Sequence, residues 1–284
     1  MTPVPSVAEH SLRPCAARLV RVDTWKPGAG HGDDCVAAEE PLEIRVDGSP
    51  LAITMRTPGD DVELAAGYAL TEGLIAGLDD LASVEPVDDV APDVRGNVVN
   101  LRLREGAADA AAANHRARRA GFIASACGVC GQGTIDAVRR RASPLPAGAS
   151  ISSATILSLP DTLRAAQEVF SATGGLHAAG LFHLDGRLIV AREDIGRHNA
   201  VDKVVGRALL NRLFPLSATA LMVSGRAGFE IVLKAWLAGI PILASVSAPS
   251  SLGVQVAEEA DMTLIGFVRG RDFTVYSGRH RIQP

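Results

Sequence analysis

The sequence predicts an α/β protein in which a small α+β domain at residues 39–106 precedes a larger α/β domain at residues 150–284. Two observations lead to this fold class. From about residue 159 helical and strand patterns alternate, which specifies a sheet covered by helices, with parallel strands among its members. Upstream, strand patterns surround a single helical pattern. Because 284 residues exceed the usual domain of ~100 to 200, two unequal units are expected.

Composition narrows the class of protein before any motif is considered. Hydrophobic residues make up 47% and charged residues 21%, which is typical of a soluble globular chain. The net charge of −4 gives no chain-wide basic field, so no nucleic-acid partner is expected. There is no continuous apolar run long enough to span a membrane, and the start MTPVPSVAEHSLRPC lacks the pattern of a secretory signal. We therefore expect a cytoplasmic protein with no membrane partner.

Residues 1–38 are predicted to form a flexible leader. Residues 1–17 are proline-rich and aperiodic, and residues 26–38 (KPGAGHGDDCVAA) are glycine-rich and polar. Both stretches are more typical of a tail and a loop than of a core. Cys15 and Cys35 lie in this leader, and neither is given a role.

The small domain begins with two runs, PLEIRV and PLAITMR, in which apolar residues alternate. They flank Asp47-Gly48, a turn signal, so a β-hairpin is expected. GDDVELAAGYALTEGLI follows as a helix whose first turn is acidic, which complements the helix dipole. Two further strands are expected near residues 81–86 and 97–104.

Residues 107–149 are predicted to form a linker that carries a CxxC loop. The segment is rich in Ala, Arg and Gly, apart from the short apolar GFIASA that leads into Cys127-Gly128-Val129-Cys130.

In the larger domain the expected elements alternate regularly. In chain order they are a helix at 161–170, a hairpin at 178–194 that turns at Asp185-Gly186, a helix at 198–211, a strand at 219–225, a helix at 229–239, a strand at 241–248, a helix at 251–260 and a strand at 263–268.

The cysteine pair is the evident chemical feature of the sequence. Glycines around Cys127 and Cys130 let the backbone present sulfur outward. Arginines at 116, 118, 119 and 139–141 would favour thiolate over thiol if they lie close. Three readings stay open at this point: a persulfide carrier, half of a structural zinc site, or a thioredoxin-like redox pair. A structural zinc site needs a second pair of ligands, and none follows Cys130 in the sequence. A thioredoxin-like pair belongs at a strand-to-helix junction, whereas this pair lies in a glycine- and arginine-rich segment.

Polar signatures recur where strands are expected to end, which is where α/β sheets generally bind ligands. REDIGRHNAVDK places cations at a helix start, where backbone amides can hold phosphate oxygens. The alternative is an exposed helix start crossed by ion pairs. SGR, with Lys234 downstream, repeats the pattern, and the glycines of TGGLH mark either a tight connection or close approach to a ligand. The candidate cofactor-binding residues are Gly174, Gly175, His177, Arg197, His198, Lys203, Arg226, Phe267, Val268, Arg269, Gly270, Arg271 and Asp272.

A set of motifs covers the chain from about residue 39 to its end: EEPLEIRVDG, TPGDDVELAAGYALTEGLI, CGVCG, TGGLHAAGL, REDIGRHNAVDKVVG, SGRAGFEIVLKAWLAGIPIL, SAPSSLGVQVA and TLIGFVRGRDFTVYSGRHRI. Together they resemble the FdhD family, sulfur carriers needed for formate dehydrogenase maturation. The resemblance implies a sulfurtransferase-type carrier: sulfur passes from a cysteine desulfurase to the loop cysteines, then to the molybdenum cofactor, Mo-bis(molybdopterin guanine dinucleotide), before insertion into the formate dehydrogenase catalytic subunit.

The same resemblance implies further expectations. Cys127 corresponds to the cysteine thought to carry the persulfide, and residues 267–272 correspond to the family's cofactor-binding segment. The resemblance also implies that the protein forms a homodimer. It also implies that the larger domain has a cytidine-deaminase-like α/β fold. Those enzymes bind zinc through H-x-E and P-C-x-x-C. Here the comparable places read His177-Ala178-Ala179 and Pro249-Ser250-Ser251, so no stably bound metal is expected. A guanine-nucleotide or cofactor chaperone whose cysteines only hold zinc is the alternative function.

Overall fold

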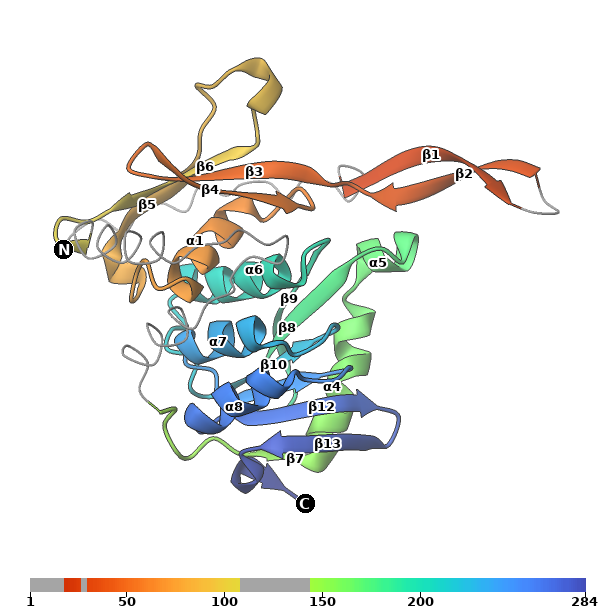
Figure 1. The fold of residues 1–284 in the computed structure, drawn as a ribbon, viewed down its shortest axis with the longest axis vertical. Coiled ribbons are helices and arrows are strands. Elements are labelled where there is room, and N and C mark those ends of the chain that lie inside the picture. The colour runs from red at the N-terminus through yellow and green to blue at the C-terminus, as the bar shows by residue number, and fades with distance from the viewer. Residues whose placement is uncertain (1–17, 27–29, 108–143) are drawn as a thin grey trace.

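The computed structural model describes residues 18–26, 30–107 and 144–284, and Figure 1 shows how their helices and strands are arranged. Two larger sheets organise these residues: a four-stranded sheet near the N-terminal half and a six-stranded sheet in the C-terminal half. Within the described ranges, no helix is long and apolar enough to cross a bilayer.

The four-stranded sheet has the order β4-β3-β6-β5 and packs on one helix. The strands are β3 (Glu40–Val46), β4 (Ser49–Arg56), β5 (Leu81–Pro86) and β6 (Val98–Leu103), and the helix is α1 (Asp61–Thr71). Asp47 and Gly48 connect β3 to β4 with φ of 49° and 80°, the positive values that a two-residue type I′ turn requires. The predicted hairpin, helix and two following strands are confirmed.

The six-stranded sheet has the order β13-β12-β11-β10-β8-β9. Strands β10, β11 and β12 run parallel, and β8 runs antiparallel to β10. The strands are β8 (His177–His183), β9 (Leu188–Asp194), β10 (Thr219–Val223), β11 (Ile242–Ser245), β12 (Thr263–Arg269) and β13 (Asp272–Ser277). The helices are α4 (Ser153–Ala165), α5 (Glu168–Thr173), α6 (Arg197–Leu210), α7 (Phe229–Leu237) and α8 (Ser251–Glu259). The alternation predicted from residue 159 is confirmed as a mixed α/β sheet.

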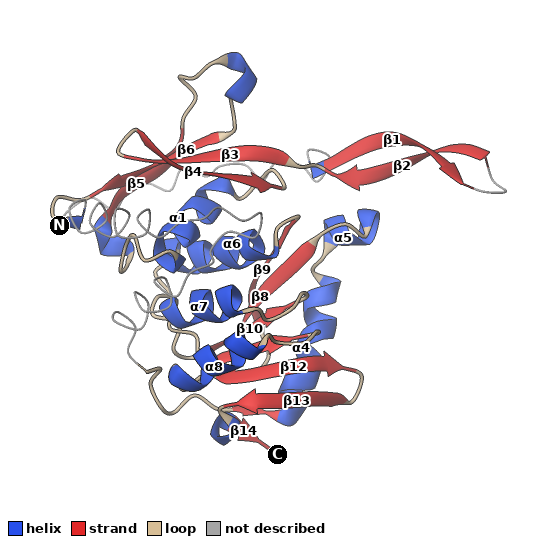
Figure 2. Cartoon of the chain, viewed as in Figure 1, coloured by secondary structure: helices blue, strands red, loops and turns tan. Residues whose placement is uncertain are grey.

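Alternate residues of these strands enter two different cores, because neighbouring side chains of a strand point to opposite faces. Leu221 and Leu243 pack with α6, α7 and α8, whereas Ala220 and Ile242 pack with α4. Figure 2 shows α4 on the opposite side of the sheet from α7 and α8.

The first of these cores also includes the small sheet and α1. Leu42, Leu64 and Val204 belong to one continuous buried cluster, so the two regions share a hydrophobic core. Helices α1 and α6 cross closely at Gly67 and Gly206, where a Cβ on either glycine would collide with backbone of the other helix.

Three differences from the predicted elements have clear causes. The prediction of a loop over 26–38 is wrong: β1 (Leu19–Lys26) and β2 (Gly30–Ala37) form an antiparallel hairpin that projects from the body (Figure 1). The strand β2 (GHGDDCVA) has no alternating apolar pattern, because the hairpin buries little of either face. Helix α4 starts earlier than predicted, at Ser153, because the Ser152 hydroxyl caps it. Strand β13 was not predicted, nor were the short strands β7 (Ile151–Ser152) and β14 (Ile282–Gln283).

Candidate functional site

The polar loops of the larger unit lie together at one end of the strands of the six-stranded sheet, which we call the strand edge. The parallel strands β10, β11 and β12 end there, and so does β9, while the antiparallel β8 begins there. Helices α6, α7 and α8 start from this edge. In Figure 1 the arrowhead of β12 points toward it, and the β1–β2 hairpin projects on the same side.

His177, Gly225 and Arg197 meet at this edge. A Cβ built on Gly225 would lie 3.4 Å from His177 Nδ1 and 3.9 Å from Arg197 Cβ. Gly225 therefore brings the loop after β10 close to the imidazole at the start of β8. Ser224 secures this arrangement, since its hydroxyl accepts a 2.8 Å hydrogen bond from the Ala178 amide. Residues from three separate segments thus form one surface.

The helix starts add a second histidine and a carboxylate. Glu230, in the first turn of α7, places Oε2 3.2 Å from His198 Nε2 and 3.9 Å from Arg197 Nη2. Among the residues that the structure describes, no side chain caps the first turn of α6 or of α7. Their free backbone amides therefore face the same edge as Arg197 and His198, which is a favourable arrangement for an anion.

The basic side chains at the strand edge affect the pKa of His177. Burial lowers the pKa of His177, the positive charges of Arg197 and His198 lower it further, and Asp194 opposes them. His177 is thus favoured in its neutral form, which can both donate and accept a hydrogen bond.

Ser245 holds the next two loops together. Its hydroxyl donates to the Gly225 carbonyl at 2.6 Å and accepts from the Ser247 amide at 3.0 Å. The Phe267 amide in turn donates to the Ser247 carbonyl at 3.2 Å. The edge is therefore connected by hydrogen bonds from β10 through β11 to β12.

Phe267 to Asp272, predicted as a cofactor segment, comprise the end of β12, the turn at Gly270 and Arg271, and the first residue of β13. Phe267 and Gly270 have positive φ, and the Arg269 guanidinium lies 5.5 Å from the centre of the Phe267 ring. A shallow hollow of about 470 Å³ is lined by Phe267, Arg269, Gly270, Arg271, Asp272, Phe273 and Thr274. Val268 is fully buried in the core, so only its backbone is available to a ligand.

Arg226, between β10 and α7, is exposed and makes no ion pair within the described part of the chain. It is therefore free to contact a ligand. Gly174 and Gly175 form the tight connection between α5 and β8: Gly174 has φ of 67° and ends α5. A Cβ on Gly175 would lie 3.9 Å from the Ala37 side chain of β2.

Lys203 does not face this edge, which corrects its prediction as a phosphate contact. The side chain is fully buried, and its ammonium lies 2.7 Å from the Asp194 carboxylate and 2.9 Å from the Thr57 carbonyl. Asp194 also accepts hydrogen bonds from the Gly196 amide and the Asn199 side chain. The pair anchors the start of α6 to the loop before α1.

Lys234, which the sequence offered as an available cation, is also occupied. Its ammonium contacts both carboxylate oxygens of Asp202 at 2.9 Å, and the Thr71 hydroxyl at 2.9 Å, inside the α1–α6–α7 packing. Burial opposes its charge, but Asp202 and Glu72 outweigh that effect and raise the pKa of Lys234.

Cys127 and Cys130 lie outside the described residues, as do the arginines at 116, 118, 119 and 139–141. Among the residues that are described, no three His, Cys, Asp or Glu side chains gather closely enough to hold a metal ion.

The model of the FdhD/NarQ family matches residues 37–283, which is most of the chain. This chain belongs to the FdhD/NarQ family. Its relatives include proteins named sulfur carrier protein FdhD. The one from Streptomyces avermitilis is 50% identical over 255 residues, covering 88% of this chain and 89% of the relative. The one from Nocardia farcinica is 49% identical over 270 residues, covering 94% of each chain.

A solved structure has the same fold as this chain. It is a crystal structure from Desulfotalea psychrophila assigned as a formate dehydrogenase accessory protein. The TM-score is 0.72 and the identity 27%, over 93% of this chain and 98% of that one. The family resemblance drawn from the sequence motifs is thus confirmed.

Two residues at the strand edge of this FdhD/NarQ chain, Glu230 and Ser245, were not predicted from its sequence. Glu230 had a weak signal, an acidic residue in the first turn of a predicted helix. Ser245 is a buried hydroxyl at the end of the apolar strand PILAS, and a lone polar residue in such a strand needs a partner. Neither feature is distinctive until the fold brings Arg197 and Gly225 beside them.

Proposed function

We propose that this chain is a cytoplasmic sulfur carrier for formate dehydrogenase maturation. It accepts persulfide sulfur from a cysteine desulfurase on Cys127 and delivers it to Mo-bis(molybdopterin guanine dinucleotide) before that cofactor enters the catalytic subunit. The observation that carries the proposal is membership of the FdhD/NarQ family over residues 37–283, with relatives named as sulfur carriers at about half identity. A homodimer and a cytidine-deaminase-like larger domain belong to the same proposal.

In the loading step, the Cys127 thiolate attacks the outer sulfur of the desulfurase persulfide. A new S–S bond forms on Cys127, the S–S bond of the donor breaks, and the desulfurase leaves as a thiolate, so charge and atoms balance. In the release step, the Cys130 thiolate attacks the Cys127 sulfur, forms a disulfide and expels hydrosulfide toward the client. The thiolate is the reactive form in each step.

The strand edge supplies the binding half of the proposal. The client carries guanine nucleotide groups with phosphates, and the edge offers Arg197, Arg226 and the uncapped starts of α6 and α7. Arginine grips phosphate oxygens in two-point fashion and helix starts favour anions. Phe267 and Arg269 offer planar groups on which a purine can stack.

Intact-mass measurement tests the carrier role. The protein is incubated with a cysteine desulfurase and cysteine, and a reducible adduct of one sulfur is expected on wild type and on Cys130→Ala. Cys127→Ala should not acquire it. If Cys127→Ala retains the adduct, Cys127 is not the primary carrier. If wild type shows zinc bound to both thiols and no adduct, the chain is a zinc-holding cofactor chaperone instead.

A further inference from the structure

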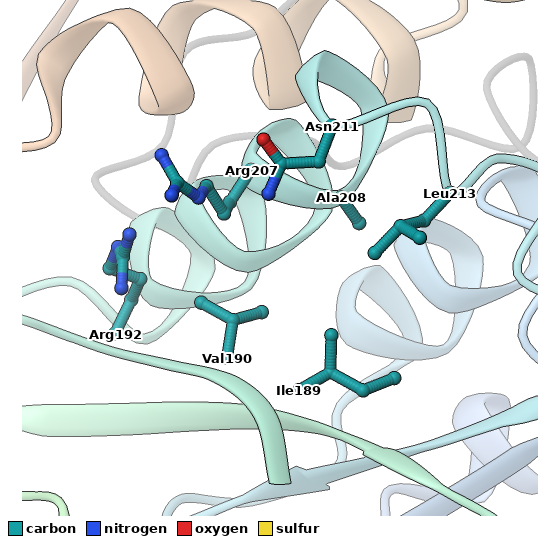
Figure 3. A pocket seen from close by; sticks show the side chains of 7 residues that line it. All are labelled: Ile189, Val190, Arg192, Arg207, Ala208, Asn211 and Leu213. Carbon is teal, nitrogen blue, oxygen red and sulfur yellow. The ribbon is translucent and has the colours of Figure 1, made fainter. Parts of the chain in front are cut away.

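A second hollow lies away from the strand edge, between β9 and the C-terminal half of α6. It has a volume of about 190 Å³ and is drawn in Figure 3. Its lining residues are Ile189, Val190, Arg192, Arg207, Ala208, Asn211 and Leu213. The guanidinium groups of Arg192 and Arg207 lie on one side of the hollow, and Ile189 and Leu213 lie on the other. The hollow therefore has one apolar side and one cationic side.

This hollow is separate from the proposed cofactor site. Arg197 starts α6 at the strand edge, whereas Arg207 lies in its last turn. At 1.5 Å rise per residue, about 15 Å of helix separates them. No residue of the hollow was predicted to take part in sulfur or cofactor chemistry.

The two arginines of the hollow differ in how completely the Glu63 carboxylate neutralises their charge. Arg192 forms a two-point contact with Glu63, with nitrogen–oxygen distances of 2.7 and 2.9 Å. Arg207 reaches the same carboxylate through one nitrogen at 3.3 Å, and its side chain is 45% exposed. In the described part of the chain, the side-chain amide of Asn211 has no hydrogen-bond partner. Donors of Arg207 and Asn211 thus remain open for an acceptor.

The floor of the hollow is the outermost strand of the large sheet. Among the described strands, β9 pairs only with β8. The start of α5 covers the far end of β9, where the Val169 and Phe170 amides donate to Glu193, but Ile189 and Val190 lie at the other end. An edge strand presents unpaired backbone groups to which an extended segment can add.

The size of the hollow decides between classes of ligand. Pockets for small molecules usually measure about 300 to 1,000 Å³, so 190 Å³ is too small for a nucleotide. It suits one apolar side chain that anchors a docking protein. Glu63 neutralises the positive charge of Arg207 only in part. A carboxylate next to the anchoring side chain of that protein would therefore be complementary to Arg207.

We propose that this hollow, with the edge of β9 at Ile189 and Val190 that no described strand pairs, is a docking site for an acidic extended segment of a partner protein. One apolar side chain of the segment fills the space between Ile189 and Leu213. An adjacent carboxylate accepts hydrogen bonds from Arg207 and Asn211, and the backbone of the segment pairs with β9.

Fluorescence anisotropy with two labelled peptides tests this site on the full chain. One peptide alternates glutamate with leucine, and the other alternates lysine with leucine. The glutamate peptide should bind wild type, and the lysine peptide should not. Arg207→Gln should weaken binding about tenfold, because one charge-assisted hydrogen bond is lost. Arg102→Gln is the matched control, because it removes an exposed arginine of the small sheet and should leave binding unchanged.

Asn211→Glu supplies a second variant at an exposed position. It places a carboxylate beside Arg207 that competes with the ligand, so binding should be lost while the circular dichroism spectrum is unchanged. Three results of the peptide titrations would overturn the proposal: no binding of the glutamate peptide, equal binding of the lysine peptide, or equal affinity of wild type and both hollow variants. If 4-methylpentanoate binds more tightly than the peptide and depends on Arg207, the hollow takes a free carboxylate, and the docking proposal is wrong.

Discussion

Residues of a single motif, REDIGRHNAVDK, divide into two groups in space. Asp194 and Lys203 are buried and bonded to one another, whereas Arg197 and His198 lie at the strand edge. A helix that starts at a sheet edge turns some side chains inward and others toward the ligand side within one turn. Density of charge in the sequence thus does not distinguish the buried anchoring residues from those that lie at the strand edge.

Lys203→Met tests the anchoring group. The change leaves the Asp194 carboxylate buried without its cation, and breaking one side of a buried pair costs about 3–5 kcal/mol. We expect the free energy of unfolding in urea to fall by that order. Arg226→Gln, at an exposed position, should change it by less than about 0.5 kcal/mol. An unfolding free energy for Lys203→Met within error of wild type would show that the pair does not anchor α6.

Arg197→Gln tests the ligand-facing group. Guanosine diphosphate, used as a probe for the guanine nucleotide part of the client, should bind about tenfold more weakly when one charge-assisted contact is lost. Calorimetric titration at two salt concentrations should also show a smaller salt dependence for the variant. Arg102→Gln removes the same charge far from the edge and serves as the control. Equal weakening by both variants would point to net charge rather than to the site.

The pKa of His177 predicts a pH dependence of stability. Its pKa in the folded protein is lowered from 6.5, first by burial and then by Arg197 and His198. As pH falls through 6.5, the unfolded chain therefore takes up a proton that the folded chain resists, and the folded state loses stability. Unfolding by urea between about pH 8 and pH 5 should show this loss in wild type, and His177→Gln should reduce it. A steeper loss in the variant would contradict the assignment.

At the scale of elements, the sequence predicts those that bury one face. Strands β3, β4, β8 and β10 were all expected, because packing against a core imposes a periodic pattern of apolar residues. The polar strand β2 was not, because GHGDDCVA packs little of its surface and so carries no such pattern. Likewise, the contact between His177 and Gly225 depends on strand order, and local patterns do not encode the order of strands in a sheet.

Gly67→Ala tests the closest crossing of two elements. A Cβ at this position would collide with the Asp202 carbonyl of α6, and neither backbone can move without disturbing the core. Overpacking a well-filled core costs about 1–3 kcal/mol, and a backbone collision belongs at the upper end. Chemical denaturation should show this loss. Gly77→Ala is the control: it has no heavy atom within 4 Å of the added carbon and an extended φ, so little change is expected.

At the scale of the whole molecule, the small sheet and the larger unit share one buried cluster. Leu64 and Leu70 of α1 lie in the same cluster as Val201 and Val205 of α6. Between the two helices, Lys234 and Asp202 add a buried ion pair that also contacts Thr71. Within the described residues, the small sheet and α1 have no buried cluster apart from this one, whereas the larger unit has a second core around α4, although the sequence patterns differ enough to predict two domains.

This shared core predicts that the two regions unfold together. Native-state hydrogen exchange should give the same opening free energy for amides of β6 and of β11, because opening either strand globally exposes the common cluster. Gly67→Ala should lower both values equally, since it acts on the contact between the two regions. If amides of β6 exchange at least tenfold faster than those of β11 at matched intrinsic rates, their opening free energies differ by at least about 1.4 kcal/mol. The small sheet then opens independently. In that case the contact between α1 and α6 would be an interface between two separately stable units rather than part of a single core.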